Sequence, residues 1–222
     1  MSSRHTINAK VYNYPIVTGT SGKPIRIHIV EKKMKGPYQI LGSRDVYKNP
    51  WMNVREDSVI RPGGTEGIFG IVEMIHGSTI LAINERREAF LVKEYRYGIG
   101  RDSIELVSGA IESAETPLDA AKRELKEELG IEASEWIDLG SVDPFTTVVR
   151  SPNHMFLALG IKEGESSPED GEVLHITKLP FQHVVDMVMR SEITHSASCV
   201  LILKANKYLH DVAQGYFDDT HV

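Results

Sequence analysis

The stretch that decides the fold is GAIESAETPLDAAKRELKEELGI, residues 109–131. It predicts one helix that begins after Thr116, because threonine is a favoured N-cap residue. Pro117 follows at the first helical position, where its missing N–H costs nothing, and Asp119 lies three residues after the cap. Gly130 ends the predicted helix, since glycine adopts the left-handed conformation of a C-cap without strain.

Three glutamates crowd one side of this predicted helix. At 100° per residue, Glu124, Glu127 and Glu128 share a sector beside a narrow apolar stripe that can pack on a sheet. Like charges three or four residues apart repel by roughly 0.2–0.5 kcal/mol per pair. Arg123 can pair with Glu127, which leaves Glu124 and Glu128 facing each other without a protein cation. A hard divalent cation is the natural complement, whereas a solvated surface is the alternative for the glutamates taken alone.

The spacing of the whole stretch is more specific than its glutamates. At average residue usage, its seven fixed glycine and charged residues coincide by chance on the order of once in 10⁸ windows. The pattern matches the Nudix box, G-x5-E-x7-R-E-U-x-E-E-x-G-U, at every position, so the chain resembles a Nudix hydrolase. The matching positions are Gly109, Glu115, Arg123, Glu124, Leu125, Glu127, Glu128, Gly130 and Ile131.

The resemblance implies metal-dependent attack of water on a nucleoside diphosphate linked to another group. In such enzymes the first and last glutamates of the box bind the metal, and they correspond to Glu124 and Glu128 here. Glu127 and Arg123 would hold the cluster in place. A backbone carbonyl just before the box glycine completes the metal shell, and Ser108 occupies that position. Mg²⁺ is the expected cofactor, with Mn²⁺ as the alternative.

Segments on both sides of the box resemble the ADP-ribose pyrophosphatase branch of the family. They run from about residue 40 to about residue 205 and include LVKEYRYGIG, IELVSGAIE, EDGEVLHITKLP and RSEITHSAS. The resemblance implies that Arg96 contacts phosphate; a surface salt bridge is the alternative role for this arginine. It also implies a catalytic base in a late loop, where Glu172 fits best. Rival bases are Glu169, Asp170 and Glu112.

Aromatic residues of the amino-terminal β region stack on the base of the substrate in this branch. Trp51 and Phe69 are the candidates by position, and ordinary strand core residues are the alternative. The branch also implies a homodimer in which each amino-terminal β segment completes the site of its partner. Trp51 would then act across the dimer.

The expected reaction is hydrolysis of the pyrophosphate of ADP-ribose, or of a related nucleoside diphosphate sugar, to a nucleoside monophosphate and a sugar phosphate. One segment departs from the branch: from the proline of VDP onward the chain reads PFTTVVRSPNH, without the usual glycine or acidic residue. That segment shapes the distal substrate pocket, so the preferred substrate stays open. The alternatives are a dinucleoside polyphosphate hydrolase and a non-catalytic ligand-binding regulator built on the same fold.

The remaining sequence predicts strands, one helix, more strands and then two helices. Strand patterns include 45–60, 67–75, 78–85 and 89–97, and helical patterns cover 181–190 and 193–210. This order favours an α+β fold over a parallel βαβ fold. The resemblance implies a Nudix-type α/β/α sandwich with a mixed β-sheet. We expect an amino-terminal extension and antiparallel β subdomain over residues 1–64, which serves as a dimerisation arm, and a Nudix domain over 65–222.

Composition narrows the partners of the chain. Its formal charge of -6 and its dispersed Lys and Arg argue against nucleic-acid binding, since phosphate neutralisation needs clustered cations. No apolar run approaches the roughly 18 residues that a membrane span needs, so no membrane partner is expected. The single cysteine, Cys199, excludes an internal disulfide and fits a reducing, cytoplasmic compartment, with a small buried apolar role for its side chain. A small molecule that carries a nucleoside diphosphate is the expected partner.

Overall fold

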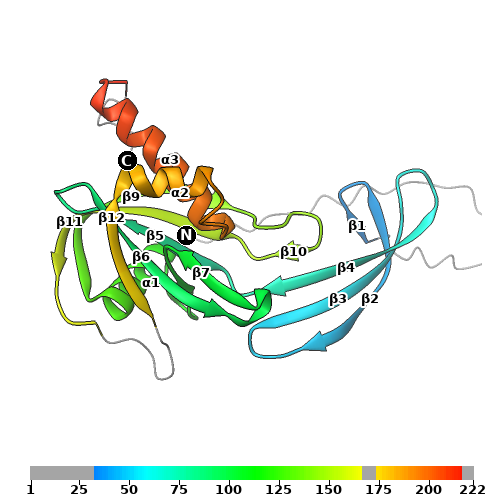
Figure 1. Ribbon diagram of the computed structural model, residues 1–222. Coiled ribbons are helices and arrows are strands. Elements are labelled where there is room, and N and C mark those ends of the chain that lie inside the picture. Colours follow the sequence, from blue (N-terminus) through cyan, green and yellow to red (C-terminus); the bar gives the residue numbers. More distant parts are fainter. Residues whose placement is uncertain (1–32, 167–173, 217–222) are drawn as a thin grey trace, which may run out of the picture.

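The computed structural model describes residues 33–166 and 174–216. Within these ranges no helix has both the length and the apolar character needed to cross a membrane. The observed architecture is an α+β fold: two sheets lie between helices in the body of the molecule, and a third sheet extends from it as an arm (Figure 1). The predicted fold class is therefore confirmed.

The arm is a five-stranded sheet in the order β1-β2-β3-β4-β10. Neighbours from β1 to β4 pair antiparallel, whereas β10 pairs parallel with β4. The arm extends away from the body, and the loop that contains β10 extends from the body and contacts the arm (Figure 1). Because β4 pairs with β3 along its length, the sheet continues past residue 64, and the boundary of the two expected domains stays a prediction. The bounds are β1 Met34–Lys35, β2 Tyr38–Lys48, β3 Met52–Ile60, β4 Glu66–Met74 and β10 Val149–Arg150.

The body contains a four-stranded sheet in the order β8-β5-β11-β9 and a three-stranded sheet in the order β12-β6-β7. The first is mixed, since β5 pairs parallel with β11 and antiparallel with β8. The second is antiparallel. The bounds are β5 Gly77–Ala82, β6 Glu88–Arg96, β7 Arg101–Glu105, β8 Val107–Ala110, β9 Ile131–Val142, β11 Asn153–Glu163 and β12 His175–Pro180.

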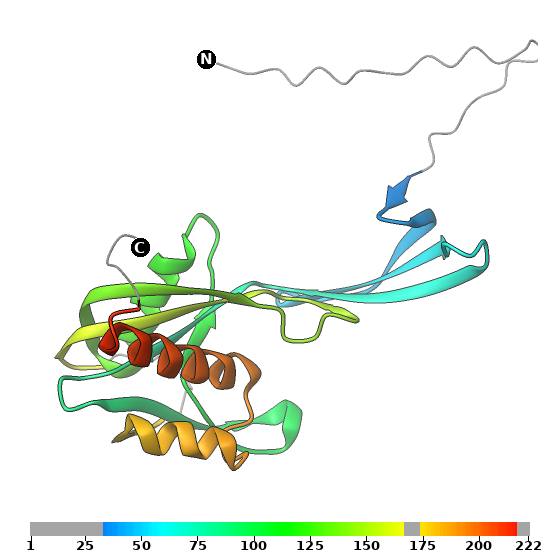
Figure 2. The same cartoon turned by 90° about the horizontal axis from the view of Figure 1, so that it is seen from above.

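The central strands are buried on both faces because their side chains alternate between two cores. Ile80 and Ala82 of β5 join the core beneath α1, whereas Leu81 packs in the core beneath α2 and α3. Figure 2 shows α1 on one side of the strands and α2 and α3 on the other. The helices are α1 Pro117–Leu129, α2 Phe181–Met189 and α3 Ser196–Ala213, and a short 3₁₀ turn, η1, covers Tyr97–Ile99.

Helix α1 confirms the start and the end that the sequence predicts. The Thr116 hydroxyl accepts the N–H of Asp119 at 3.1 Å, and Pro117 is the first helical residue. Gly130 ends the helix at φ 65°, in the left-handed region that glycine adopts without strain. Leu125 and Leu129 are buried, so the apolar stripe packs on the sheet as expected.

Two expectations about secondary structure are wrong in detail. The pattern 45–60 is not one strand, because the Asn49 side chain accepts the N–H groups of Trp51 and Met52 and turns the chain between β2 and β3. The last helix begins at Ser196 rather than at Ile193. Ile193 is buried in the core of α2 and α3, within the irregular connection that leads to His195.

Candidate active site

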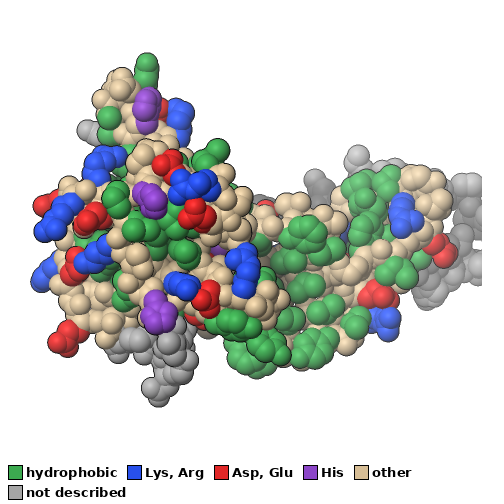
Figure 3. Space-filling view, in the orientation of Figure 1, with side chains coloured by type: hydrophobic (Ala, Val, Ile, Leu, Met, Phe, Trp, Pro, Cys, Tyr) green, Lys and Arg blue, Asp and Glu red, His purple; other side chains and the backbone are tan. Residues whose placement is uncertain are grey.

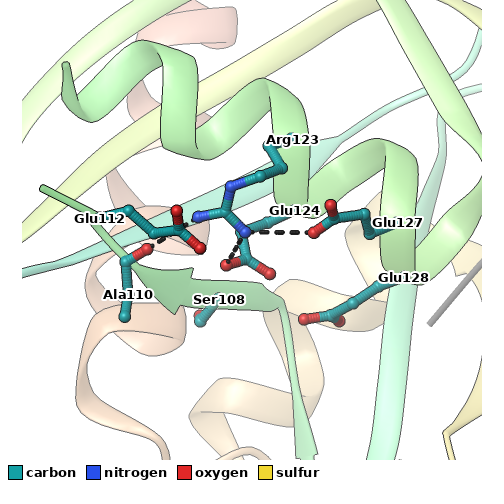
Figure 4. Close-up of a pocket in the computed structure, with 7 residues that line it drawn as sticks. All are labelled: Ser108, Ala110, Glu112, Arg123, Glu124, Glu127 and Glu128. Atoms are coloured by element: carbon teal, nitrogen blue, oxygen red, sulfur yellow. Dashed lines mark hydrogen bonds and ion pairs between the residues drawn. The ribbon is translucent and has the colours of Figure 1, made fainter. Parts of the chain in front are cut away.

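The carboxyl-terminal half of α1 and the end of β8 enclose a cavity of about 200 Å³. Acidic side chains dominate it, and Arg123 enters from the helix (Figure 4). Ordinary helix geometry produces this set, because residues four apart on α1 lie on one face and point at the same strand end. The cavity is lined by Ser108, Ala110, Glu112, Arg123, Glu124, Glu127 and Glu128.

Arg123 binds three carboxylates in and beside the cavity. Its Nη1 donates to Glu124 Oε1 at 2.8 Å and to Glu127 Oε2 at 3.1 Å. Its Nε and Nη2 bind the two carboxylate oxygens of Glu115 at 2.8 and 3.1 Å, and Nη2 also donates to the carbonyl of Ala110 at 3.0 Å. The expectation that Arg123 would leave Glu124 without a protein cation is therefore wrong. The guanidinium fork reaches two carboxylates through one nitrogen, which a pairing rule for helix neighbours does not consider.

Glu115 gives this network a measurable pH dependence. Hydrogen bonds from Arg123 and from the backbone of Glu112 lower the pKa of Glu115 from 4.5 to about 2. Because the pKa is depressed in the folded protein, the stabilisation is complete above about pH 4.5 and is lost as the pH falls through about 2. We expect Glu115→Gln to lower the Tm at neutral pH, and the gap from wild type to close over that acid range.

Thermal unfolding followed by circular dichroism measures this effect. Glu135→Gln, an exposed change on β9, is the matched control, and it should show no comparable gap at any pH. A gap for Glu115→Gln that stays constant from neutral pH down to about 2 would contradict the assignment.

Gly109 explains why Glu124 can lie against β8. A Cβ atom at residue 109 would come within 1.8 Å of Glu124 Oε1 and 2.5 Å of Glu124 Cγ. No side chain fits there, so the glycine leaves the space that the Glu124 carboxylate occupies. Glycine is needed here for the close approach of a neighbouring side chain, and not for an unusual φ angle.

Arg96 lies on the same face of the sheet as α1. Val92 packs in the core beneath α1, and side chains at two-residue intervals along β6 share its face. Arg96 Nη2 and Nε bind the Glu105 carboxylate at 2.8 and 3.2 Å, and Nη1 binds Glu94 at 2.8 Å. Hydrogen bonding to Glu105 and the charges of Glu94 and Glu128 hold the pKa of Arg96 above its ordinary value, against the effect of burial. The alternative role of Arg96, a salt bridge, is thus present in this structure.

A second cavity, of about 540 Å³, contains Arg96 and shares Ser108 with the first. Its other lining residues include Glu105 and His195. The Ser108 hydroxyl lies 2.8 Å from that of Thr79 on the neighbouring strand β5, which fixes its side chain between the two cavities. The structure therefore brings the box glutamates, Ser108 and Arg96 to one region.

The two aromatic candidates lie on the arm. Phe69 packs edge-on against Tyr38, with ring centroids 5.2 Å apart, and lines a groove of about 860 Å³. Trp51 lies at the β2–β3 turn with 67% of its surface exposed, so the alternative role of a strand core residue is wrong for it. Neither residue lines the two cavities of the body within the described chain.

The expected base, Glu172, lies outside the described residues, as do its rivals Glu169 and Asp170. Glu112 lines the acidic cavity. Sequence patterns did not single out Glu105 or its neighbour His195. Both lie in segments that carried the resemblance, but no spacing rule connects two residues ninety positions apart.

The donor chemistry of the acidic cavity fits a hard divalent cation. Carboxylate oxygens are the ligands that Mg²⁺ prefers, and four glutamates line the cavity. Gly109 leaves the room that one of them needs. Across residues 33–166 and 174–216, however, no three Asp, Glu, His or Cys side chains are already arranged as a metal cluster. The donors share a cavity, and Glu124 is turned toward Arg123 in this arrangement.

The sequence model of the NUDIX domain family matches residues 76–196, more than half of the chain. The chain belongs to the Nudix family. A second model, the nucleoside diphosphate sugar hydrolase N-terminal domain, matches residues 38–72 of this Nudix protein. The resemblance that the box predicts is therefore confirmed, and the chain is a Nudix pyrophosphohydrolase similar to ADP-ribose pyrophosphatases.

Known proteins similar to this Nudix chain include enzymes and a regulator. An ADP-ribose pyrophosphatase of Mycobacterium tuberculosis is 28% identical over 182 residues, which cover 81% of this chain and 86% of that protein. A methanol dehydrogenase activator of Bacillus methanolicus is 22% identical over 165 residues, 72% of this chain and 88% of that protein. The crystal structure of an ADP compounds hydrolase has a TM-score of 0.71 at 18% identity and covers 83% of this chain and 100% of its own, which shows a shared fold.

Proposed function

We propose that this protein hydrolyses the pyrophosphate of ADP-ribose, or of a related nucleoside diphosphate sugar, to a nucleoside monophosphate and a sugar phosphate. The observation that carries the proposal is the convergence of the Nudix glutamates and Arg96 on two cavities that share Ser108. The match of residues 38–72 to a nucleoside diphosphate sugar hydrolase domain supports the substrate class. The similar ADP-ribose pyrophosphatase supports it independently.

Nudix hydrolases generally use divalent metal ions, and we assign Mg²⁺ to this site, with Mn²⁺ as the alternative. Glu124, Glu128 and the backbone carbonyl of Ser108 would hold it. When bound, such an ion neutralises the diphosphate and stabilises the charge that develops on its oxygens. Arg123 and Glu127 would orient the ligating carboxylates, as the hydrogen bonds of Arg123 to both Glu124 and Glu127 support.

Arg96 would contact a phosphate of the substrate through its guanidinium group. Glu172 remains the proposed general base, which takes a proton from the attacking water. Glu112 is the rival within the described chain, because it lines the acidic cavity. Trp51 and Phe69 remain the proposed residues for stacking on the base, and a second copy of the chain would bring them to the site.

The surface of the arm supports a homodimer. Large apolar side chains on β2, on β4 and at the β2–β3 turn are exposed, and Figure 3 shows apolar surface along the arm. Pairing of Val54 with both Tyr47 and Val72 puts all three side chains on one face, and Ile68 and Met74 join them at even spacing from Val72. Contiguous apolar surface of this kind marks an interaction site. The exposed apolar residues are Leu41, Val46, Tyr47, Trp51, Ile68 and Met74.

We expect the protein in solution to have about twice its chain mass of 24.8 kDa. Ile68→Glu should shift it to the monomer, because a charge in the proposed interface would have to be desolvated without a partner. Light scattering measures the mass, and Val212→Glu, at an exposed apolar residue of α3, is the control. A monomeric wild-type protein at assay concentration would contradict the dimer.

A regulatory role is the second candidate function, because the similar proteins include a methanol dehydrogenase activator. The departure at residues 144–154, PFTTVVRSPNH, keeps dinucleoside polyphosphates as alternative substrates. The deciding experiment is an assay of ADP-ribose, GDP-mannose, UDP-glucose and diadenosine polyphosphates with Mg²⁺ and with Mn²⁺. Cleavage of a nucleoside diphosphate sugar to two monophosphates supports the proposal. Metal-dependent ligand binding without any turnover would favour the regulator.

A further inference from the structure

Arg96 binds two carboxylates through different nitrogens. Glu105 takes Nε and Nη2 in a bidentate pair, and Glu94 takes Nη1 alone. A bidentate pair fixes the plane of the guanidinium, whereas a single contact at Nη1 leaves that plane unchanged when it breaks. Nη1 is therefore the nitrogen that can exchange partners without moving the arginine.

The two carboxylates differ in burial. The side chain of Glu105 is 7% exposed, whereas that of Glu94 is 28% exposed and that of Arg96 is 39% exposed. A buried carboxylate that loses its cation pays a large desolvation cost, and a partly exposed one recovers water contacts. Glu105 is the permanent partner of Arg96 by this argument, and Glu94 is the replaceable one.

Residues at the start of helix α3 contact the turn that contains Glu105. Leu106 lies between β7 and β8, and its N–H donates to the hydroxyl of Ser198 at 2.9 Å. Ser198 is fully buried in the first turn of α3, and His195 Nδ1 lies 2.8 Å from its hydroxyl. The same imidazole nitrogen lies 3.6 Å from Glu105 Oε2, the oxygen that binds Arg96 Nη2. The backbone of this turn is thus held by α3, and the His195 ring lies beside the Glu105 carboxylate.

We propose that Glu105 is a positioning residue that aims Arg96 at the diphosphate of the substrate, and that a phosphate oxygen replaces Glu94 at Nη1. The inference rests on the proposed function, because it requires a phosphate-bearing substrate at Arg96. It assigns α3, through Ser198 and His195, the role of holding this arginine in place. Two carboxylates on one guanidinium then have opposite effects on substrate binding.

Steady-state kinetics on the best substrate of the assay panel tests the proposal. Glu105→Gln keeps the size of the side chain but turns an amide N–H₂ toward one arginine nitrogen, so Arg96 loses its fixed plane. We expect KM to rise about tenfold, the effect of one charge-assisted contact. We expect kcat to stay within about threefold, since a contact made equally in the ground state and the transition state changes KM alone.

Glu94→Gln is the matched control, because it changes the other carboxylate on the same arginine. Its KM should fall, since the substrate no longer competes with a charged partner for Nη1. In an Arg96→Lys background, Glu105→Gln should add less than about twofold to KM, because residues that act through one group are not additive. Glu105→Asp, which keeps the charge but shortens the reach, should give an intermediate KM and serves if Glu105→Gln does not fold.

Several results would overturn the proposal: a KM for Glu94→Gln that rises as much as for Glu105→Gln, additive effects in the Arg96→Lys background, or a folded Glu105 variant with wild-type KM. If the wild-type protein cleaves nothing in the panel, the proposed function fails and the inference fails with it. If the wild-type protein is active and the KM pattern is absent, the positioning role alone is wrong.

Discussion

Glu124→Gln is expected to lower kcat at least about 10³-fold, since Glu124 as the proposed metal ligand would supply several kcal/mol of transition-state stabilisation and each 1.36 kcal/mol is about tenfold. Glutamine has nearly the same size, and its amide oxygen can still accept from Arg123 Nη1, which lies 2.8 Å from Glu124 Oε1. The fold should therefore survive. What disappears is the negative charge that a hard cation requires.

The same variant should lose affinity for Mg²⁺ in a calorimetric titration. Glu127→Gln provides the comparison within the cavity: a residue that braces the ligands costs about 10- to 100-fold when it is changed. Glu132→Gln is the matched control outside the cavity, because Glu132 is exposed and pairs with Lys126 at the surface. A wild-type kcat for Glu124→Gln would contradict the metal assignment. A decrease in kcat no larger than that of Glu127→Gln would contradict it as well.

Gly109→Ala should abolish most of the activity without unfolding the protein. The added methyl group would lie 1.8 Å from Glu124 Oε1 and 1.9 Å from Glu124 Cδ, closer than non-bonded atoms can approach. The atoms that it meets belong to the flexible end of the Glu124 side chain. The carboxylate therefore moves aside, and the backbone conformation stays unchanged. If Glu124 is a metal ligand as proposed, a displaced carboxylate no longer meets the geometry that Mg²⁺ demands. We expect kcat to fall about 10²-fold or more.

The Tm of Gly109→Ala should stay close to that of the wild type. Gly63→Ala, in the β3–β4 turn with open space around the added atom, is the matched control and should leave both kcat and Tm unchanged. An active Gly109→Ala protein would mean that Glu124 works from another orientation. A protein that is inactive because it does not fold would mean that residue 109 has a backbone role instead.

Local rules predicted the elements with strong short-range signals. The cap at Thr116, the proline after it and the left-handed Gly130 specify α1 within a few residues of chain, and the structure confirms all three. The end of the β2 pattern was missed because the Asn49 side chain competes for backbone N–H groups, which strand propensity does not include. The start of α3 was missed because Ile193 continues the helical pattern, although the N-cap His195 is extended and the helix begins only at Ser196.

The sequence alone determined the α+β class, the Nudix box and the family, because these depend on residue types at fixed spacings along one continuous segment. The tertiary structure alone decided which groups meet. Arg123 binds Glu115 and Glu124 as well as Glu127, and Arg96 is clamped by Glu105 with Ser198 and His195 behind it. Hydrogen bonds and ion pairs form between groups a few ångströms apart. Only the packing of α1 and α3 on the sheet brings residues so distant in the chain that close.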